Sequence, residues 1–286
     1  MATPVVSGNT RIVGIFGDPI AHTRSPAMQN AAFQACNLSY IYVPFLIPPS
    51  DLSRAVQSIR ALHLAGVNVT VPHKEKIVRY LDSLSEEAQL CGAVNTIINR
   101  DGHLFGDNTD GRGFLQSLKE YGLSPQQGEV ILIGAGGSAR SVFVSLLRAQ
   151  YGPVTIVNRT IANAKLLARS YRHLGNTPVN ALPLDALRST ALLQRASLII
   201  NSTSVGLHGD EFFPLAYDTT PRNCIFYDLL YRPEPTSFLR GAQKVRRAIL
   251  DGREMLLHQG ALAFSLWTGT PAPIQVMRRA LGRALR

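Results

Sequence analysis

The sequence is poor in cysteine, and its few cysteines are widely spaced. Cys36, Cys91 and Cys224 stand far apart in a chain of 286 residues, and their number is odd. A disulfide framework needs an even set of cysteines, and a zinc site needs ligands at short spacing, so neither is expected and we predict no metal. We interpret the cysteines as reduced thiols, which are typical of a cytoplasmic protein.

Long apolar runs and a surplus of acidic residues are also lacking. No run reaches membrane-spanning length, and the first residues do not show the charged-then-apolar pattern of a signal peptide. Basic residues outnumber acidic ones by 29 to 19, which gives a formal net charge of +10. Many of them lie in 244–247 and 278–286, without the interleaved aromatic residues that favour nucleic-acid binding. We expect a solvated basic face, and neither nucleic acid nor a membrane as a partner.

The sequence does contain a nucleotide-binding turn. An apolar run from Val130 ends in Gly134-Ala-Gly-Gly-Ser-Ala139 and passes into a helical pattern. The first glycine allows a tight turn, the second lets the backbone approach a pyrophosphate, and the helix N-terminus offers free N–H groups. We therefore expect the cofactor phosphates to bind along Gly134, Ala135, Gly136, Gly137, Ser138 and Ala139.

The next predicted strand ends in Asn158-Arg-Thr160. An NAD site would place an acidic residue here for the ribose 2′-hydroxyl, whereas an arginine and a hydroxyl suit a 2′-phosphate. Asn158, Arg159 and Thr160 therefore favour NADP over NAD.

Strand and helix patterns alternate along the chain, which predicts an α/β fold with mostly parallel sheets. We expect an α/β substrate-binding and catalytic domain over 1–110, and a Rossmann-type, doubly wound domain over 111–251. Residues 252–286 are expected to return to the first domain, with a ligand cleft between the two. Strands are expected over 11–17, 40–47, 66–71, 93–99, 103–106, 130–133, 154–157, 198–201, 224–228 and 248–250.

Four polar clusters precede the nucleotide turn, each where a predicted strand ends or a helix begins. Singly, such residues are more often helix caps, surface lysines or partners of buried backbone than ligands. Together they offer hydroxyl, amide, amine and carboxylate groups at strand ends, where open α/β sheets bind ligands. That set suits a small polyhydroxylated substrate. The clusters contain Thr23 and Ser25, then Asn68, Thr70 and Lys74, then Asn95, and finally Asp110.

These motifs resemble those of the shikimate dehydrogenase family, and they occur in the family's order over nearly the whole chain. The resemblance implies NADPH-dependent reduction of 3-dehydroshikimate to shikimate, a step toward chorismate and the aromatic amino acids. The matching strings lie at 17–26, 68–74, 92–96, 106–111, 134–137, 158–160, 201–206 and 255–260.

The resemblance also implies residue roles. Lys74 and Asp110 would be the catalytic pair, and both would contact the substrate. The substrate carboxylate would lie near Thr23, Ser25 and Tyr231. The ring hydroxyls would be bound by Asn68, Thr70, Asn95, Asp110 and Gln259. The nicotinamide would be bordered by Asn201, Thr203, Ser204, Gly252 and Met255.

This chemistry is reasonable on physical grounds. Hydride transfer to a ketone develops negative charge on its oxygen, and a cationic Lys74 can stabilise that charge and supply the proton. Asp110 can orient the lysine and hold a neighbouring hydroxyl. The nicotinamide supplies the hydride, so no metal is needed.

Three positions depart from the family pattern. Thr23 replaces the more usual serine, which adds a methyl group to the carboxylate pocket. Asn163 stands where NADP-specific members often carry a second basic residue, which weakens the preference for NADP. Arg253-Glu254 replaces a smaller Leu-Gly pair beside the nicotinamide.

Two other functions compete with this prediction. The nearer one is a quinate/shikimate dehydrogenase that uses NAD or NADP. The other is a nucleotide-binding regulatory module without catalysis, but such a module has no need of Lys74, Asp110 and Gln259. The sequence is compatible with a homodimer and does not set the oligomeric state.

Overall fold

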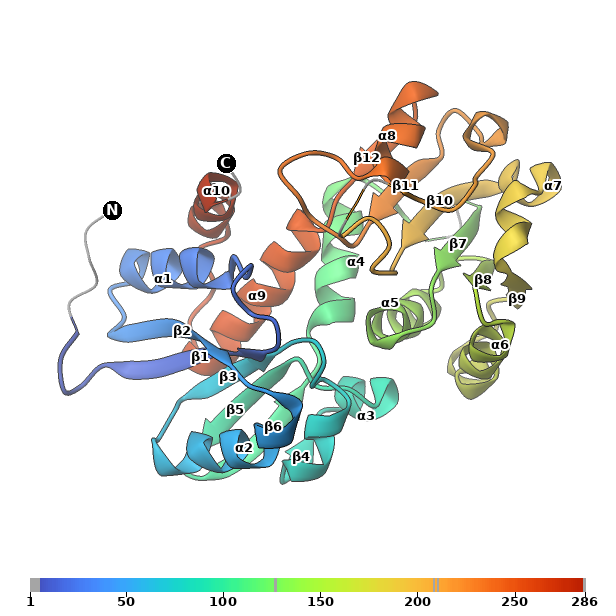
Figure 1. Cartoon of the computed structure of the whole chain (residues 1–286). Coiled ribbons are helices and arrows are strands. Elements are labelled where there is room, and N and C mark those ends of the chain that lie inside the picture. Colours follow the sequence, from blue (N-terminus) through green and yellow to red (C-terminus); the bar gives the residue numbers. More distant parts are fainter. Residues whose placement is uncertain (1–5, 126–127, 208, 210, 285–286) are drawn as a thin grey trace. The chain divides into compact units, whose positions relative to one another are not determined.

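The computed structural model describes residues 6–125, 128–207, 209 and 211–284. The fold is α/β, as predicted, and two compact units each hold a sheet that has six strands among these residues (Figure 1). Unit 1 comprises Met1–Gly113 and Leu256–Arg286, and unit 2 comprises Phe114–Met255. The boundaries fall inside two helices, α4 (Asp110–Glu120) and α9 (Arg253–Thr268).

The sheet of unit 1 is mixed. Its strand order is β2-β1-β3-β5-β6-β4, in which β1 pairs in parallel with β2 and β3, and β5 is antiparallel to β3 and β6. The turn between β5 and β6 has positive φ at both Asp101 and Gly102, as a two-residue hairpin turn of this twist requires. The strands are β1 (Arg11–Gly17), β2 (Tyr40–Leu46), β3 (Gly66–Val69), β4 (Ser83–Leu84), β5 (Thr96–Arg100) and β6 (His103–Asp107).

Helices cover both faces of this sheet (Figure 1). On one face α2 (Leu52–Ala61) buries Val56 and Ile59 against strand residues such as Val67. On the other, α1 (Ser25–Ala35) and α9 are joined by stacked rings of Phe33 and Phe264, 5.2 Å apart. The remaining helical segments are η1 (Pro49–Asp51), η2 (Lys76–Tyr80), α3 (Glu86–Cys91) and α10 (Ile274–Ala284).

The sheet of unit 2 is parallel, in the order β12-β11-β10-β7-β8-β9. The chain order reverses between β7 and β10, which is the switch point where a doubly wound sheet binds its ligand. Two hydrophobic clusters cover the two faces of the sheet. The strands are β7 (Glu129–Ile133), β8 (Val154–Asn158), β9 (Val179–Pro183), β10 (Ala196–Asn201), β11 (Ile225–Asp228) and β12 (Ala248–Leu250).

The helices of unit 2 follow its strands in alternation, as a parallel sheet requires. The main ones are α5 (Gly137–Arg148) and α6 (Ile161–Ser170), which follow β7 and β8. Shorter segments are η3 (Arg172–Leu174), η4 (Leu184–Arg188), α7 (Thr190–Leu193), η5 (Tyr217–Thr219) and α8 (Ser237–Lys244).

Some local predictions differ from the structure. The strand expected over 66–71 ends at Val69, and the strand expected from 93 begins at Thr96. Ahead of Thr96 the backbone no longer pairs with β3 in the ladder register, since the Val94 N–H donates to the Lys74 carbonyl. The basic tail forms α10, although its last two residues lie outside the described part of the chain. Among the described residues, no helix has the length and apolar composition needed to cross a membrane.

Candidate active site

Lys74 and Asp110 form an ion pair in unit 1. The Lys74 Nζ donates to Asp110 Oδ2 at 2.5 Å, and the side chains are only 20% and 7% exposed. The other carboxylate oxygen of Asp110 accepts from Asn95 Nδ2 at 2.7 Å. Lys74 is fixed through its backbone as well, since its carbonyl accepts from Val94 N. The two residues expected to form the catalytic pair therefore lie together.

The position of Asp110 follows from the short connection between β6 and α4. Only Asn108 and Thr109 separate the end of the strand from the start of the helix. The backbone N–H of Asp110 donates to Asn108 Oδ1 at 3.1 Å, and that of Thr109 donates to Asn95 Oδ1 at 2.8 Å. These side chains satisfy N–H groups that the helix itself cannot, so Asp110 begins α4 in a fixed orientation.

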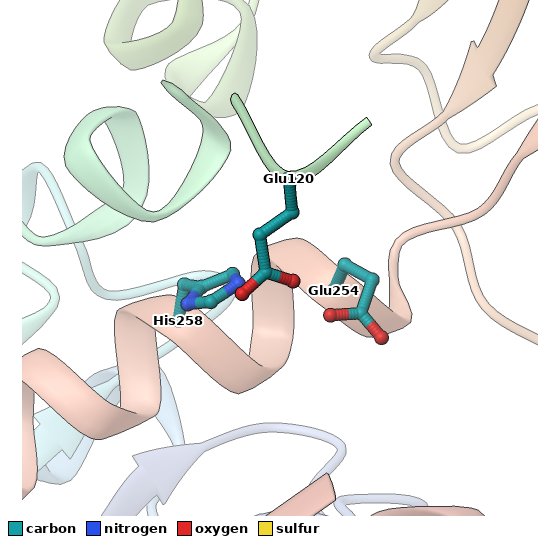
Figure 2. A group of neighbouring side chains, drawn as sticks. All are labelled: Glu120, Glu254 and His258. Carbon is teal, nitrogen blue, oxygen red and sulfur yellow. The ribbon is translucent and has the colours of Figure 1, made fainter. Parts of the chain in front are cut away.

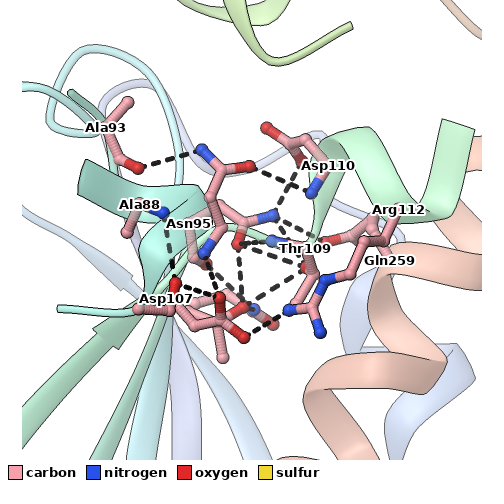
Figure 3. Close-up of polar contacts among 12 residues, drawn as sticks. Ala88, Ala93, Asn95, Asp107, Thr109, Asp110, Arg112 and Gln259 are labelled. Atoms are coloured by element: carbon pink, nitrogen blue, oxygen red, sulfur yellow. Dashed lines mark hydrogen bonds and ion pairs between the residues drawn. The ribbon is translucent and has the colours of Figure 1, made fainter. Parts of the chain in front are cut away.

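The Asn95 amide is the centre of the surrounding network (Figure 3). Its Nδ2 donates to Thr109 Oγ1 at 2.9 Å, and it lies 3.3 Å from Gln259 Oε1. Gln259 comes from α9, which lies close to α4 because Gly113 has no side chain. A Cβ at Gly113 would be 2.6 Å from the backbone nitrogen of Gln259. The network thus connects strand, helix and a segment distant in sequence.

Asn68 joins this group from β3. Its Oδ1 accepts from Tyr42 Oη at 2.8 Å, and its Nδ2 donates to the Asn95 carbonyl and to Thr96 Oγ1, both at 3.1 Å. Thr70 follows the same strand, with its methyl group close to Gly17. The amide of Asn68 is therefore oriented by the protein itself.

The other predicted substrate residues are Thr23, Ser25 and Tyr231. Thr23 and Ser25 contact each other, since the Ser25 N–H donates to Thr23 Oγ1 at 3.4 Å, where α1 begins. Ser25 is buried and Thr23 is half-buried. Tyr231 belongs to unit 2 and is half-buried, three residues after β11.

The nucleotide-binding turn in unit 2 has the expected backbone. Gly134 follows β7 with φ of +116°, a conformation that favours glycine. Gly136 precedes α5, and a Cβ there would meet open space, which leaves the backbone accessible to a ligand. Gly137, Ser138 and Ala139 form the first turn of α5. This turn can hold a pyrophosphate at the helix N-terminus.

Residues 158–160 follow at the end of β8, the strand that pairs with β7 in the sheet of unit 2. Asn158 ends β8 and donates from Nδ2 to the Thr160 carbonyl at 2.9 Å, which closes the turn before α6. Arg159 and Thr160 are exposed. The guanidinium is thus accessible to a phosphate, and Asn163 lies exposed in the first turn of α6.

A buried aspartate organises the loops after β10 and β11. Asp228 is inaccessible to solvent and accepts from Asn201 Nδ2 and from Leu230 N, both at 3.0 Å, and from Thr236 Oγ1 at 2.6 Å. Asn201 Oδ1 in turn accepts from the hydroxyl of Thr203 at 2.7 Å. Burial raises the pKa of Asp228 to about 6, although these donors favour its charged form.

Ser204, Gly252 and Met255 complete the residues expected beside the nicotinamide. Ser204 is exposed. A Cβ at Gly252 would lie 2.2 Å from the Leu229 carbonyl oxygen, so only glycine allows this approach to the strand end. Met255 is 8% exposed and packs in the hydrophobic core of unit 2.

One group of possible metal ligands was not expected. Glu120 at the end of α4, with Glu254 and His258 on α9, places ligand atoms within 4.8 Å of one another (Figure 2). Carboxylates and imidazole are ligands of divalent metals. However, Glu120 is exposed, and exposed acidic groups often gather without an ion. The cluster therefore supports no metal assignment.

Three family models match the chain. They describe a shikimate dehydrogenase substrate binding domain over residues 15–97, a shikimate/quinate 5-dehydrogenase over 118–208, and a shikimate 5′-dehydrogenase C-terminal domain over 252–281. A protein of Symbiobacterium thermophilum named shikimate dehydrogenase (NADP(+)) is 44% identical, over 97% of this chain and 96% of that protein.

Solved structures give the same result. A shikimate dehydrogenase in complex with NADP⁺ has a TM-score of 0.89 and 34% identity, covering 99% of this chain and 98% of the other. The shikimate 5-dehydrogenase of Thermus thermophilus, in complex with NADP(H) and shikimate, has a TM-score of 0.86 and 37% identity, covering 96% and 100%. The chain belongs to the shikimate dehydrogenase family.

Sequence reasoning within this family missed several residues that form the site. Asp107 and Arg112 form an ion pair beside Asp110, and Thr96 and Thr109 bond to Asn95 (Figure 3). Asp107 lies in the family string at 106–111, but an Asp–Arg pair five residues apart gives no periodic signal in the sequence. Asp228 had a weak signal, because it is an acidic residue ending an apolar strand.

The raised pKa of Asp228 gives a prediction about stability. An aspartate with a native pKa above its unfolded value binds more protons in the folded state at acidic pH, so stability falls as the pH rises through that interval. Relative to Asp228→Asn, the wild type should lose about 2 kcal/mol of unfolding free energy between pH ~4.5 and pH ~7.5.

Urea unfolding followed by circular dichroism would test this prediction. The single tryptophan, Trp267, lies in unit 1 and does not report on unit 2. Parallel stability curves for the two proteins would show that Asp228 does not titrate in this interval.

Proposed function

We propose that this chain is an NADP-dependent shikimate dehydrogenase, which reduces 3-dehydroshikimate to shikimate reversibly in the biosynthesis of aromatic amino acids. The observation that carries the proposal is the shielded Lys74–Asp110 ion pair, held in a network of neutral amides and hydroxyls. A proton donor beside a carboxylate, with hydrogen-bonding groups around it, suits reduction of a ketone on a polyhydroxylated ring.

The proposed mechanism assigns the proton transfer to unit 1. When bound, NADPH supplies the hydride. Lys74 places its ammonium at the carbonyl oxygen, stabilises the negative charge that develops there, and donates a proton to it. Asp110 orients the ammonium through its short hydrogen bond. Asn95 fixes the other oxygen of Asp110, so the carboxylate cannot rotate away.

The two units would bind different ligands. Unit 1 would bind the substrate, in agreement with the substrate-binding family model over 15–97, and unit 2 would bind NADP. Thr23 and Ser25, with Tyr231, are assigned to the substrate carboxylate. The ring hydroxyls are assigned to Asn68, Thr70, Asn95, Asp110 and Gln259, all from unit 1.

The residues of unit 2 fit NADP. The open backbone at Gly136 and the N-terminus of α5 suit the pyrophosphate, and the exposed guanidinium of Arg159 suits the 2′-phosphate. Asn201, Thr203, Ser204 and Gly252 are assigned to the nicotinamide side. The side chain of Met255 is packed in the core, so its assigned contact is limited to the atoms that reach the surface.

A quinate/shikimate dehydrogenase is the second candidate, because one matching family model covers both activities. Formation of NADPH from shikimate and NADP⁺, followed by its near-ultraviolet absorbance, tests the main proposal. The same assay with quinate and with NAD⁺ separates the two enzymes. No turnover with any combination would leave a regulatory module as the remaining function.

We infer a cytoplasmic location from the three free cysteines, two of which are buried. The homodimer stays a prediction, which sedimentation equilibrium would test.

Lys74→Ala should lower kcat about 10²–10⁴-fold and leave the KM for shikimate nearly unchanged, because the proton and charge are needed mainly in the transition state. Lys76→Ala is the matched control, since Lys76 is an exposed lysine two residues away. Steady-state kinetics of both variants would check this. A kcat of Lys74→Ala within threefold of the control would remove Lys74 from the mechanism.

Arg159→Ala should raise the KM for NADP⁺ roughly ten- to a hundredfold and hardly change that for NAD⁺, which lacks the 2′-phosphate. Arg169→Ala, at the far end of α6, is the control. Initial rates with both cofactors would measure the ratio. Equal losses for NADP⁺ and NAD⁺ would mean that Arg159 has another role, such as stacking on adenine.

The methyl group of Thr23 should crowd the carbon that carries the extra hydroxyl of quinate. We predict that kcat/KM favours shikimate over quinate at least tenfold, about 1.4 kcal/mol of discrimination. Thr23→Ser should keep shikimate turnover within a few-fold and reduce this preference slightly. Similar kcat/KM values for both acids in the wild type would instead support the quinate/shikimate enzyme.

A further inference from the structure

We propose that the ion pair between Asp107 and Arg112 is a positioning device that holds the connection carrying Asp110, and through it the Lys74–Asp110 pair. Neither residue is expected to touch the substrate. The inference rests on the proposed function, because its effect is measured on shikimate turnover.

Asp107 is a buried carboxylate with three different partners. Its side chain is 4% exposed and pairs with the guanidinium of Arg112. Its Oδ1 accepts from Ser85 Oγ at 2.5 Å and from the backbone N–H of Asn108 at 2.7 Å. Ser85 in turn caps α3 by accepting from Ala88 N at 3.1 Å. Asp107 therefore connects the end of β6, the start of α3 and the first residue of the connection to α4.

Arg112 supplies the countercharge from the first turn of α4. Its side chain is 38% exposed, so the pair is shielded mainly on the Asp107 side. The Nε of Arg112 is buried and has no acceptor among the described residues. Asp107 is therefore the partner on which the placement of this guanidinium depends.

The pair closes a short loop of chain around the catalytic aspartate. Asp107 ends β6, Arg112 lies in α4, and Asp110 lies between them in the sequence. The Asn108 N–H donates to Asp107, and the Asn108 side chain accepts from the Asp110 N–H at 3.1 Å. Each link in this chain of hydrogen bonds fixes the next, so displacement of the Asp107 carboxylate would be transmitted to the backbone of Asp110.

Charge gives a second reason for the pair. Two buried carboxylates, Asp107 and Asp110, lie within four residues of each other. Lys74 compensates Asp110 and Arg112 compensates Asp107. Without Arg112, Asp107 would be a buried charge without a cationic partner, which is strongly unfavourable, and the connection would rearrange to expose it. A shift of about 1 Å in a catalytic group can cost roughly 10²-fold in rate.

The experiment compares Asp107→Asn, Arg112→Gln and the double variant. Asp107→Asn keeps the shape and an acceptor oxygen but removes the charge, and Arg112→Gln removes the cation. We expect each single variant to lower kcat at least about tenfold and to leave the KM for shikimate within about threefold. The double variant should be no worse than the poorer single variant, because both changes break the same contact.

Turnover is expressed per shikimate-binding site, counted by calorimetric titration, because Asp107 and Arg112 lie in unit 1, to which substrate binding is assigned. A residue needed only for folding would reduce the number of sites and leave kcat per site unchanged. Arg60→Gln is the matched control, because it breaks another ion pair of unit 1, Arg60–Asp82 at 2.7 Å, in which both side chains are more than a third exposed.

The outcomes separate the alternatives. A kcat per site within threefold of Arg60→Gln would overturn the inference, as would additive losses in the double variant or a loss confined to the number of sites. A wild type without shikimate turnover would overturn the proposed function and this inference with it. An active wild type with unaffected variants would overturn the inference alone.

Discussion

The arrangement of unit 1 depends on one side-chain amide, that of Asn95. Its nitrogen donates to Asp110 and Thr109, and its oxygen accepts from the Thr109 N–H and from Thr96 Oγ1. A buried amide can meet these demands in only one orientation, since its two ends differ in hydrogen-bonding character. Asn95 therefore fixes the start of α4 with respect to β5, and with it the carboxylate that holds Lys74.

In unit 2 the carboxylate of Asp228 holds the connecting loops in place. The loops after β10 and β11 have little regular structure, and their free N–H and hydroxyl groups converge on Asp228. Because these loops follow parallel strands on one side of the switch point, they lie where the sheet binds its ligand. The carboxylate of Asp228 orders the loops through these hydrogen bonds, although burial disfavours its charged form and raises its pKa.

Much of this could be predicted from sequence, for identifiable reasons. The strand expected over 11–17 is rich in apolar residues and has the expected bounds. The α/β fold and the family were confirmed. The strand at Val179–Pro183 and the pairing of Asp107 with Arg112 were not predicted. The former is short, partly exposed and ends in proline, and the latter depends on a turn whose geometry no periodic pattern encodes.

Asp110 and Asp228, both buried, show why residue type alone does not give function. Asp110 faces the ammonium of Lys74, so in the proposed mechanism its charge orients the group that donates the proton. Asp228 faces an amide, a hydroxyl and a backbone N–H, none of which titrates near neutral pH. Its charge can orient neighbours but cannot assist proton transfer through them. The partners that the fold brings to each carboxylate, rather than its burial, separate the aspartate proposed to be catalytic from the structural one.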